Sequence, residues 1–181
     1  MKHLYVCRHG ESELNARGIY AGQTDTPLTN HGREQARLAG AQAHGLNIDK
    51  IVASPLVRAY ETAQIIAEQT GYPTEDILTT PLIMERALGS LEGQPYSAGP
   101  ETVENCRDIE PDADLDARAR AALEYIQSLE ADTVLVVSHG TFLLAFNRIL
   151  GGTLDEELPN AHIVQFDLKE TSHDPNYVLD R

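Results

Sequence analysis

The stretch Val6-Cys7-Arg8-His9-Gly10-Glu11-Ser12 decides the fold, because a short apolar run, residues 4–7, ends there directly before Arg-His-Gly. An apolar run of this length bounded by glycine predicts a buried strand. Side chains that follow such a strand project from its carboxyl end, and ligands bind at that edge of an open α/β sheet. The stretch therefore predicts both a buried strand and a ligand site that contains Arg8 and His9.

Two later junctions repeat this pattern. Residues 134–140 (VLVVSHG) form an apolar run that ends in His-Gly, and residues 50–53 form another run that is followed by residues 54–58 (SPLVR). A planar guanidinium holds two phosphate oxygens at once, and the amino terminus of a helix adds backbone donors. The side chains predicted to converge on a phosphoryl group at this edge are Arg8, His9, Arg58 and His139.

Helical patterns separate the predicted strands. The first begins at a Thr29 cap and ends near Gly45, and the second has Ser54 as its cap, with Pro55 in the first turn, and ends at Gly71. Two more helices are expected over residues 115–129 and 139–150, and a last strand over residues 161–168. This alternation predicts an α/β fold in three layers, with a mostly parallel sheet flanked by helices. One domain over residues 1–181 is expected.

Residues 93–114 form an insertion of a different character. Pro95, Gly99, Pro100 and Pro111 interrupt it, and Arg107 is the single basic residue among several acids. We expect a short, lid-like excursion over the carboxyl end of the sheet. A solvated acidic loop is favoured over a lid that shapes the substrate site, although loops of this length are often functional.

Charge and hydropathy exclude several classes of protein. The chain has 14 Lys and Arg against 28 Asp and Glu, a net charge of −14. So acidic a chain repels polyanions, and neither nucleic acid nor a membrane surface is an expected partner. The apolar stretches fall short of the roughly 18 residues of a membrane span, and the amino terminus lacks a signal peptide's apolar core, so we expect a cytoplasmic protein. Cys7 and Cys106 are expected to be structural thiols.

Five blocks of the sequence together resemble the histidine phosphatase superfamily, branch 1, the phosphoglycerate mutase-like family. They occur in the family's order between residue 4 and about residue 151. The blocks are Arg8-His9-Gly10-Glu11-Ser12 followed by Asn15, residues 25–29 (DTPLT) with Gly32 and Gln35-Ala36, residues 54–63 (SPLVRAYETA), Glu85 with Gly89 and residues 91–93 (LEG), and Val137-Ser138-His139-Gly140. The resemblance implies a phosphoglycerate mutase-like fold.

The resemblance also implies a role for each matched residue. His9 would be the nucleophile that becomes phosphohistidine, and Glu85 the acid that protonates the leaving alcohol. Glu11 and Glu92 are either carboxylates that orient catalytic groups or solvated charges. The remaining implied contacts are Arg8, Arg58 and His139 to the phosphoryl oxygens, and Asn15 and Gly140 to the substrate.

Two positions depart from the family pattern. Ala21 stands where members often carry Gln or a small polar residue, and Leu91 where they often carry Trp. We expect the first to alter pocket affinity or substrate choice, and the second to alter packing only.

The leading hypothesis is a metal-independent phosphomonoester phosphatase, of the histidine acid phosphatase type, that acts through a phosphohistidine on a small phosphorylated metabolite. No Walker loop, G-x-G-x-x-G or metal-ligand spacing occurs, so neither a metal nor another cofactor is expected. The acidic insertion disfavours substrates with several phosphates and favours a neutral or amine-bearing leaving group. Neutral His9 and protonated Glu85 together predict a bell-shaped pH profile with an optimum at mildly acidic to neutral pH.

Two alternatives remain. A phosphoglycerate mutase needs basic residues that retain the substrate carboxylate, and the insertion supplies only Arg107. A non-catalytic module that binds phosphorylated ligands would have lost His9 or Glu85, and both are present. Hydrolysis is therefore favoured over both.

Overall fold

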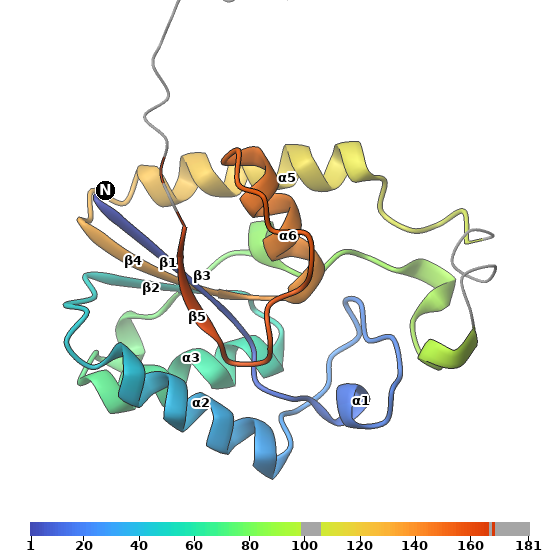
Figure 1. Ribbon diagram of the computed structural model, residues 1–181, viewed down its shortest axis with the longest axis horizontal. Coiled ribbons are helices and arrows are strands. Elements are labelled where there is room, and N and C mark those ends of the chain that lie inside the picture. The colour runs from blue at the N-terminus through green and yellow to red at the C-terminus, as the bar shows by residue number, and fades with distance from the viewer. Residues whose placement is uncertain (99–105, 167, 169–181) are drawn as a thin grey trace, which may run out of the picture.

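A mixed sheet forms the centre of the computed structural model, which describes residues 1–98, 106–166 and 168. Its strands are β1 (His3–Arg8), β2 (Lys50–Ala53), β3 (Leu78–Thr79), β4 (Thr133–Ser138) and β5 (Ile163–Phe166). Within the described residues the strand order is β3-β2-β4-β1-β5. The first four strands in that order are parallel to one another, whereas β5 runs antiparallel to β1 (Figure 1). The predicted, mostly parallel sheet is confirmed, with an antiparallel edge strand.

Helices cover both faces of this sheet. The α-helices are α1 (Glu13–Ala16), α2 (Asn30–Ala43), α3 (Val57–Thr70), α5 (Asp112–Gln127) and α6 (Gly140–Ile149), and 3₁₀ turns occupy Thr74–Asp76, Pro81–Ile83, Gly89–Leu91 and Tyr96–Ala98. α2 and α3 pack together on one face, and α5 and α6 on the other (Figure 1). The three-layer α/β fold is thus confirmed. None of the helices in the described ranges is long and apolar enough to span a bilayer.

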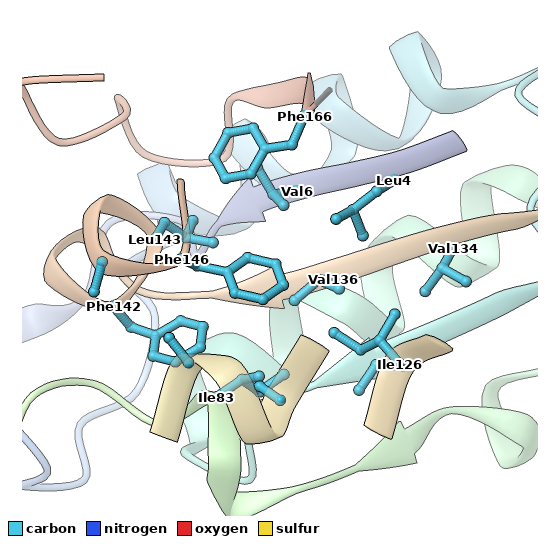
Figure 2. Close-up of a cluster of buried hydrophobic side chains, with 14 of the residues drawn as sticks. Leu4, Val6, Ile83, Ile126, Val134, Val136, Phe142, Leu143, Phe146 and Phe166 are labelled. Atoms are coloured by element: carbon cyan, nitrogen blue, oxygen red, sulfur yellow. The ribbon is translucent and has the colours of Figure 1, made fainter. Parts of the chain in front are cut away.

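The core lies on both sides of the central strands, because each face meets a helical layer. Every residue of β4 is buried. On the α5–α6 side, Phe146 stacks on Phe142 with ring centroids 5.6 Å apart, and Phe166 of β5 lies 6.4 Å from Phe146 (Figure 2). A second cluster, which contains Cys7 and Ile51, faces α2 and α3. The strand ends that carry the polar motifs are therefore anchored in a rigid, two-sided core.

Some predicted element ends are confirmed and others are wrong. The Thr29 hydroxyl caps α2 by accepting a hydrogen bond from the Gly32 N–H, and Gly71 ends α3 in a left-handed conformation with φ +73°. Ser54 does not cap α3, which begins at Val57 with Leu56 as its N-cap, because the Ser54 hydroxyl is engaged elsewhere. α5 begins at Asp112 rather than at residue 115. The last strand is shorter than expected, since Ala161 lies in a turn.

Candidate active site

Three neighbouring parallel strands end at one edge of the sheet, and the predicted site residues follow them. Arg8 at the end of β1 lies opposite Ser138 of β4, and Ala53 of β2 lies opposite Val137. His9 and His139 come next after β1 and β4, and their ring centroids are 5.1 Å apart. The register of the sheet therefore brings the two histidines together, as the sequence predicted.

A close approach of backbone at Gly10 holds the first of these turns. A Cβ atom at Gly10 would lie 2.4 Å from the carbonyl oxygen of Gly32, so only glycine fits against the start of α2. The Gly10 N–H donates to the buried Thr62 hydroxyl at 3.0 Å, and that hydroxyl donates to the Arg58 carbonyl at 2.7 Å. The turn that carries His9 is thus tied to α3.

His9 has a defined tautomer. Its Nδ1 lies 2.6 Å from the Gly10 carbonyl oxygen, and its Nε2 lies 3.2 Å from Nε of Arg58. A carbonyl only accepts and a guanidinium N–H only donates, so the hydrogen is assigned to Nδ1 and the lone pair to Nε2. Burial, together with the charge of Arg58, holds the pKa of His9 well below its ordinary value. His9 is therefore a neutral imidazole whose Nε2 lone pair can attack an electrophile.

His139 is assigned the same tautomer, through a different partner. Its Nε2 lies 2.8 Å from Oγ of Ser54, and that oxygen also accepts a hydrogen bond from the Leu56 N–H at 3.3 Å. We assign the Ser54 hydroxyl proton to the bond with His139, because the Leu56 N–H can only donate. Nδ1 of His139 then carries a hydrogen, and this buried atom has no hydrogen-bond partner among the described residues. Burial and then the charge of Arg58 lower the pKa of His139 as well.

The two arginines are held by backbone carbonyls. Arg58 is almost fully buried, and its Nη1 and Nη2 donate to the carbonyl oxygens of Thr24 (3.0 Å) and Gly22 (2.7 Å). Arg8 donates from Nη1 to the Leu158 carbonyl at 2.9 Å and pairs through Nη2 with Glu157 at 3.0 Å. Nε of Arg8 is buried and, within the described part of the chain, unpartnered.

Glu85 lies at the amino terminus of α6. Its Oε1 accepts hydrogen bonds from the N–H groups of Arg86 (2.8 Å) and Phe142 (3.0 Å), and its Oε2 accepts one from Thr141 (3.3 Å). Burial raises the pKa of Glu85 above its ordinary value, and the Glu157 carboxylate adds to the increase, against the effect of the backbone hydrogen bonds. A raised pKa favours the protonated form of the carboxyl group, which is the form that general acid catalysis requires.

Several of these side chains line a cavity of about 700 Å³. Arg8, His9, Asn15, Arg58 and Glu85 all line it. The side chain of Asn15 is also engaged by the backbone and hydroxyl of Ser12 in a capping box, and it donates to the Tyr96 hydroxyl at 3.3 Å. Across residues 1–98 and 106–166, no group of three or more His, Cys, Asp or Glu side chains is arranged to bind a metal ion.

The other two predicted site residues, His139 and Gly140, are buried and are not among the residues that line this cavity. His139 packs against the His9 ring. Gly140 begins α6, where a Cβ atom would lie 2.2 Å from Oε2 of Glu157. Glycine at this position therefore allows the Glu157 carboxylate to reach the site.

The described parts of the insertion are largely exposed, as expected of a solvated loop, but they also line this cavity. Tyr96, Cys106 and Ile109 line the cavity together with His9. Cys106 is only partly buried there, unlike the core thiol Cys7, so its expected structural role is not supported. Residues 99–105, which belong to the same insertion, lie outside the described residues.

A model of the histidine phosphatase superfamily (branch 1) matches residues 4–177. The chain belongs to this superfamily. A candidate phosphoserine phosphatase of Hydrogenobacter thermophilus is 31% identical over 179 residues, covering 90% of this chain and 85% of that protein. A 2,3-bisphosphoglycerate-dependent phosphoglycerate mutase of Bartonella bacilliformis is 30% identical over 181 residues, covering 86% and 84%.

The fold of this histidine phosphatase superfamily member also matches solved structures. The mycobacterial glucosyl-3-phosphoglycerate phosphatase, in complex with VO3, superposes with a TM-score of 0.80 at 26% identity, covering 91% of this chain and 90% of that chain. The named relatives are thus phosphatases and a mutase, and the predicted phosphoglycerate mutase-like fold is confirmed.

Sequence reasoning missed several residues of this superfamily site. Ser54 lay within a quoted block but was interpreted as a helix cap, and Thr62 lay in the same block without a role. Glu157 follows the last block, and no motif marks it.

The two glutamates whose role the sequence left open are both engaged. Glu92 accepts hydrogen bonds from the N–H groups of Gln23 (2.9 Å) and Leu88 (3.1 Å), so it supports the cavity wall. Glu11 similarly accepts a bond from the Thr29 hydroxyl at 2.7 Å.

Proposed function

We propose that this chain is a phosphomonoester phosphatase that transfers the phosphoryl group of a small metabolite first to His9 Nε2 and then to water. One observation carries the proposal. Two buried N–H donors, Nε of Arg8 and Nδ1 of His139, have no partner among the described residues. Arg8 lines the cavity together with His9, and the His139 ring packs against the His9 ring. Buried donors are rarely left unpaired, since each costs about 1–3 kcal/mol. Phosphoryl oxygens bound at this position satisfy both.

The first step uses the tautomer of His9. The Nε2 lone pair attacks phosphorus, and the bond from phosphorus to the ester oxygen breaks. The Glu85 carboxyl group gives its proton to that oxygen, so the product leaves as a neutral alcohol. The Arg58 guanidinium and the Arg8 Nε–H stabilise the charge on the equatorial oxygens. The products of this step are phospho-His9, the alcohol and a Glu85 carboxylate.

The second step reverses these roles. The Glu85 carboxylate takes a proton from water, the water oxygen attacks phosphorus, and the bond from phosphorus to Nε2 breaks. Inorganic phosphate leaves, and the His9 lone pair and the Glu85 proton are restored. Two arginines supply the positive charge that the phosphoryl group requires, and we propose a mechanism without a metal ion.

Hydrolysis is favoured over mutase activity by the charges around the cavity. Besides Arg8 and Arg58, Arg86 is the cation that lines it within the described residues. Arg86 is already engaged, through Nε to the Glu110 carbonyl at 2.7 Å and through Nη1 to Asp112 at 2.9 Å. Little positive charge is left to retain a phosphoglycerate carboxylate while water is excluded.

Phosphate release tests the proposal. The wild-type chain is assayed in EDTA with p-nitrophenyl phosphate, phosphoserine and 3-phosphoglycerate, beside His9→Ala and the control His44→Ala, which changes an exposed histidine. We expect turnover by wild type and the control, none by His9→Ala, and an acid-labile phosphoprotein only where His9 is present. Absence of turnover by wild type, or undiminished turnover by His9→Ala, contradicts the proposal. Rapid interconversion of 2- and 3-phosphoglycerate identifies a mutase instead.

A further inference from the structure

The cavity extends beyond the phosphoryl end, and its outer part has a different character. The phosphoryl end is formed by charged side chains, which are described above. The outer part is formed by three separate segments of the chain, namely the loop before α2, the turn after Glu85 and the described parts of the insertion. Apart from Arg86, its lining is mostly apolar and includes Tyr20, Ala21, Leu88, Leu91, Tyr96, Cys106 and Ile109. Leu91, which was expected to affect packing only, is therefore part of the cavity wall.

Two tyrosines form one wall of this outer part, and backbone hydrogen bonds hold them in place. The Tyr20 and Tyr96 rings meet edge to face, with centroids 4.8 Å apart and planes at 70°. The Tyr20 N–H donates to the Gln94 carbonyl at 2.9 Å, and the Tyr96 N–H donates to the Gly18 carbonyl at 2.7 Å. The insertion and the loop before α2 therefore pair with each other, and the aromatic wall is built in advance of binding.

The outer part offers little to a charged leaving group. Its one cation among the described lining residues, Arg86, is bound to the Glu110 carbonyl and to Asp112. The nearby carboxylates, Glu85 and Glu157, lie at the phosphoryl end. A leaving group with a carboxylate would lose hydration there without gaining an ion pair.

We propose that the leaving group of this enzyme is an apolar alcohol, with an aromatic ring or a hydrocarbon of similar size placed against Tyr20, Tyr96 and Ile109. This inference rests on the proposed phosphatase function and adds the class of ester that it hydrolyses. A cavity of this volume accommodates such a group beside the phosphoryl oxygens, and apolar pockets with a few polar anchors are typical of small-molecule sites. Phosphorylated sugars, glycerate and serine belong to the disfavoured class.

A matched set of esters tests the preference. 2-Phenylethyl phosphate, glycerol 3-phosphate and 3-phosphoglycerate are all esters of primary alcohols, so differences in their kcat/KM do not come from an activated phenol. One methylene in an apolar pocket changes specificity by about tenfold or more. We therefore expect kcat/KM for 2-phenylethyl phosphate to exceed that for glycerol 3-phosphate by at least about tenfold, with 3-phosphoglycerate the poorest.

A variant then locates the effect. Tyr96→Ala is expected to lower the ratio of kcat/KM for 2-phenylethyl phosphate to that for glycerol 3-phosphate by about fivefold or more, whereas Tyr96→Phe, which keeps the ring, holds the ratio within about twofold. A general loss of structure would lower both rates alike and leave the ratio unchanged.

The outcomes separate this inference from the proposed function. If His9-dependent hydrolysis occurs but glycerol 3-phosphate or 3-phosphoglycerate is preferred, the apolar leaving group is wrong and the phosphatase stands. An unchanged ratio in Tyr96→Ala overturns the assigned wall. If no ester releases phosphate, p-nitrophenyl phosphate included, the phosphatase proposal fails and this inference fails with it.

Discussion

Replacing Ser54 by alanine tests how the tautomer of His139 is set. Ser54 is fully buried, and its hydroxyl is 2.8 Å from His139 Nε2. If the hydroxyl donates to Nε2, the hydrogen of the imidazole must lie on Nδ1. We propose that this Nδ1–H donates to a phosphoryl oxygen. Alanine removes that donor and leaves Nε2 buried without a partner. The ring then adopts either tautomer, and only one of them donates to the phosphoryl group.

The size of the effect follows from the contacts that are lost. A buried polar atom left unpaired costs about 1–3 kcal/mol. If this cost falls on the tautomer that the reaction needs, kcat/KM drops by about 5- to 150-fold, because 1.4 kcal/mol corresponds to tenfold. The Leu56 N–H loses an acceptor as well. The free energy of unfolding therefore falls by about 1–3 kcal/mol, which lowers Tm by about 2–12 °C for a chain of this length.

Kinetics measures the loss of activity, and NMR measures the tautomer of His139. kcat/KM for p-nitrophenyl phosphate is compared among wild type, Ser54→Ala and the surface control Ser128→Ala, at a temperature where all are folded. ¹⁵N NMR of the histidine rings reports the tautomer, and we expect protonated Nδ1 for His139 in wild type and a mixture in Ser54→Ala. Wild-type kcat/KM in a folded Ser54→Ala, or a wild-type ring protonated on Nε2, would refute the reasoning.

Three further predictions concern the acid, its neighbour and the core. Glu85→Gln should lower kcat for alkyl phosphates by about 10²- to 10⁴-fold. It should lower kcat for p-nitrophenyl phosphate less, because the p-nitrophenolate leaves without a proton. Equal losses of kcat on both esters would exclude Glu85 as the acid. Activity requires neutral His9, whose pKa is lowered, so the acidic limb of the pH profile lies below the ordinary histidine pKa. Activity also requires protonated Glu85, so it falls as the pH rises through the raised pKa of Glu85. Glu157→Gln removes a negative charge that raises the pKa of Glu85, so the alkaline limb of the pH profile of kcat/KM should move to lower pH. The control Glu156→Gln, which changes an exposed carboxylate, should leave that limb in place. An unmoved limb in Glu157→Gln would contradict this coupling. Phe146→Ala empties a buried site between two other phenylalanines and should reduce the free energy of unfolding in urea by about 3–5 kcal/mol. The control Leu38→Ala, at a residue that is 59% exposed, should reduce it by less than about 0.5 kcal/mol. A loss below about 1 kcal/mol in Phe146→Ala would mean that the cluster in Figure 2 is loosely packed.

The layered fold and the central site residues could be predicted from local patterns. The three buried strands, the Thr29 cap and the glycine that ends α3 each depend on a few neighbouring residues, and such patterns act wherever they occur in a chain. The junctions after β1, β2 and β4 then placed Arg8, His9, Arg58 and His139 at one edge, because parallel strands present their carboxyl ends together.

Contacts between distant residues could not be predicted in this way. Ser54 was interpreted as a helix cap because its neighbours in sequence suit one, yet its hydroxyl bonds to His139 from another strand. Glu157 pairs with Arg8 across most of the chain, and no motif around residue 157 indicates it. The apolar walls of the cavity likewise come from segments that meet only after folding.

The amino-acid sequence thus specified which side chains lie at the carboxyl edge of the sheet, because strand ends and turns are local properties. The tertiary structure decided what each of them can do. The proton position on His9 depends on the Gly10 carbonyl and on Arg58, and the raised pKa of Glu85 depends on burial and on Glu157. Hydrogen bonds, desolvation and charge act through space over a few ångströms, and only the folded chain sets those distances.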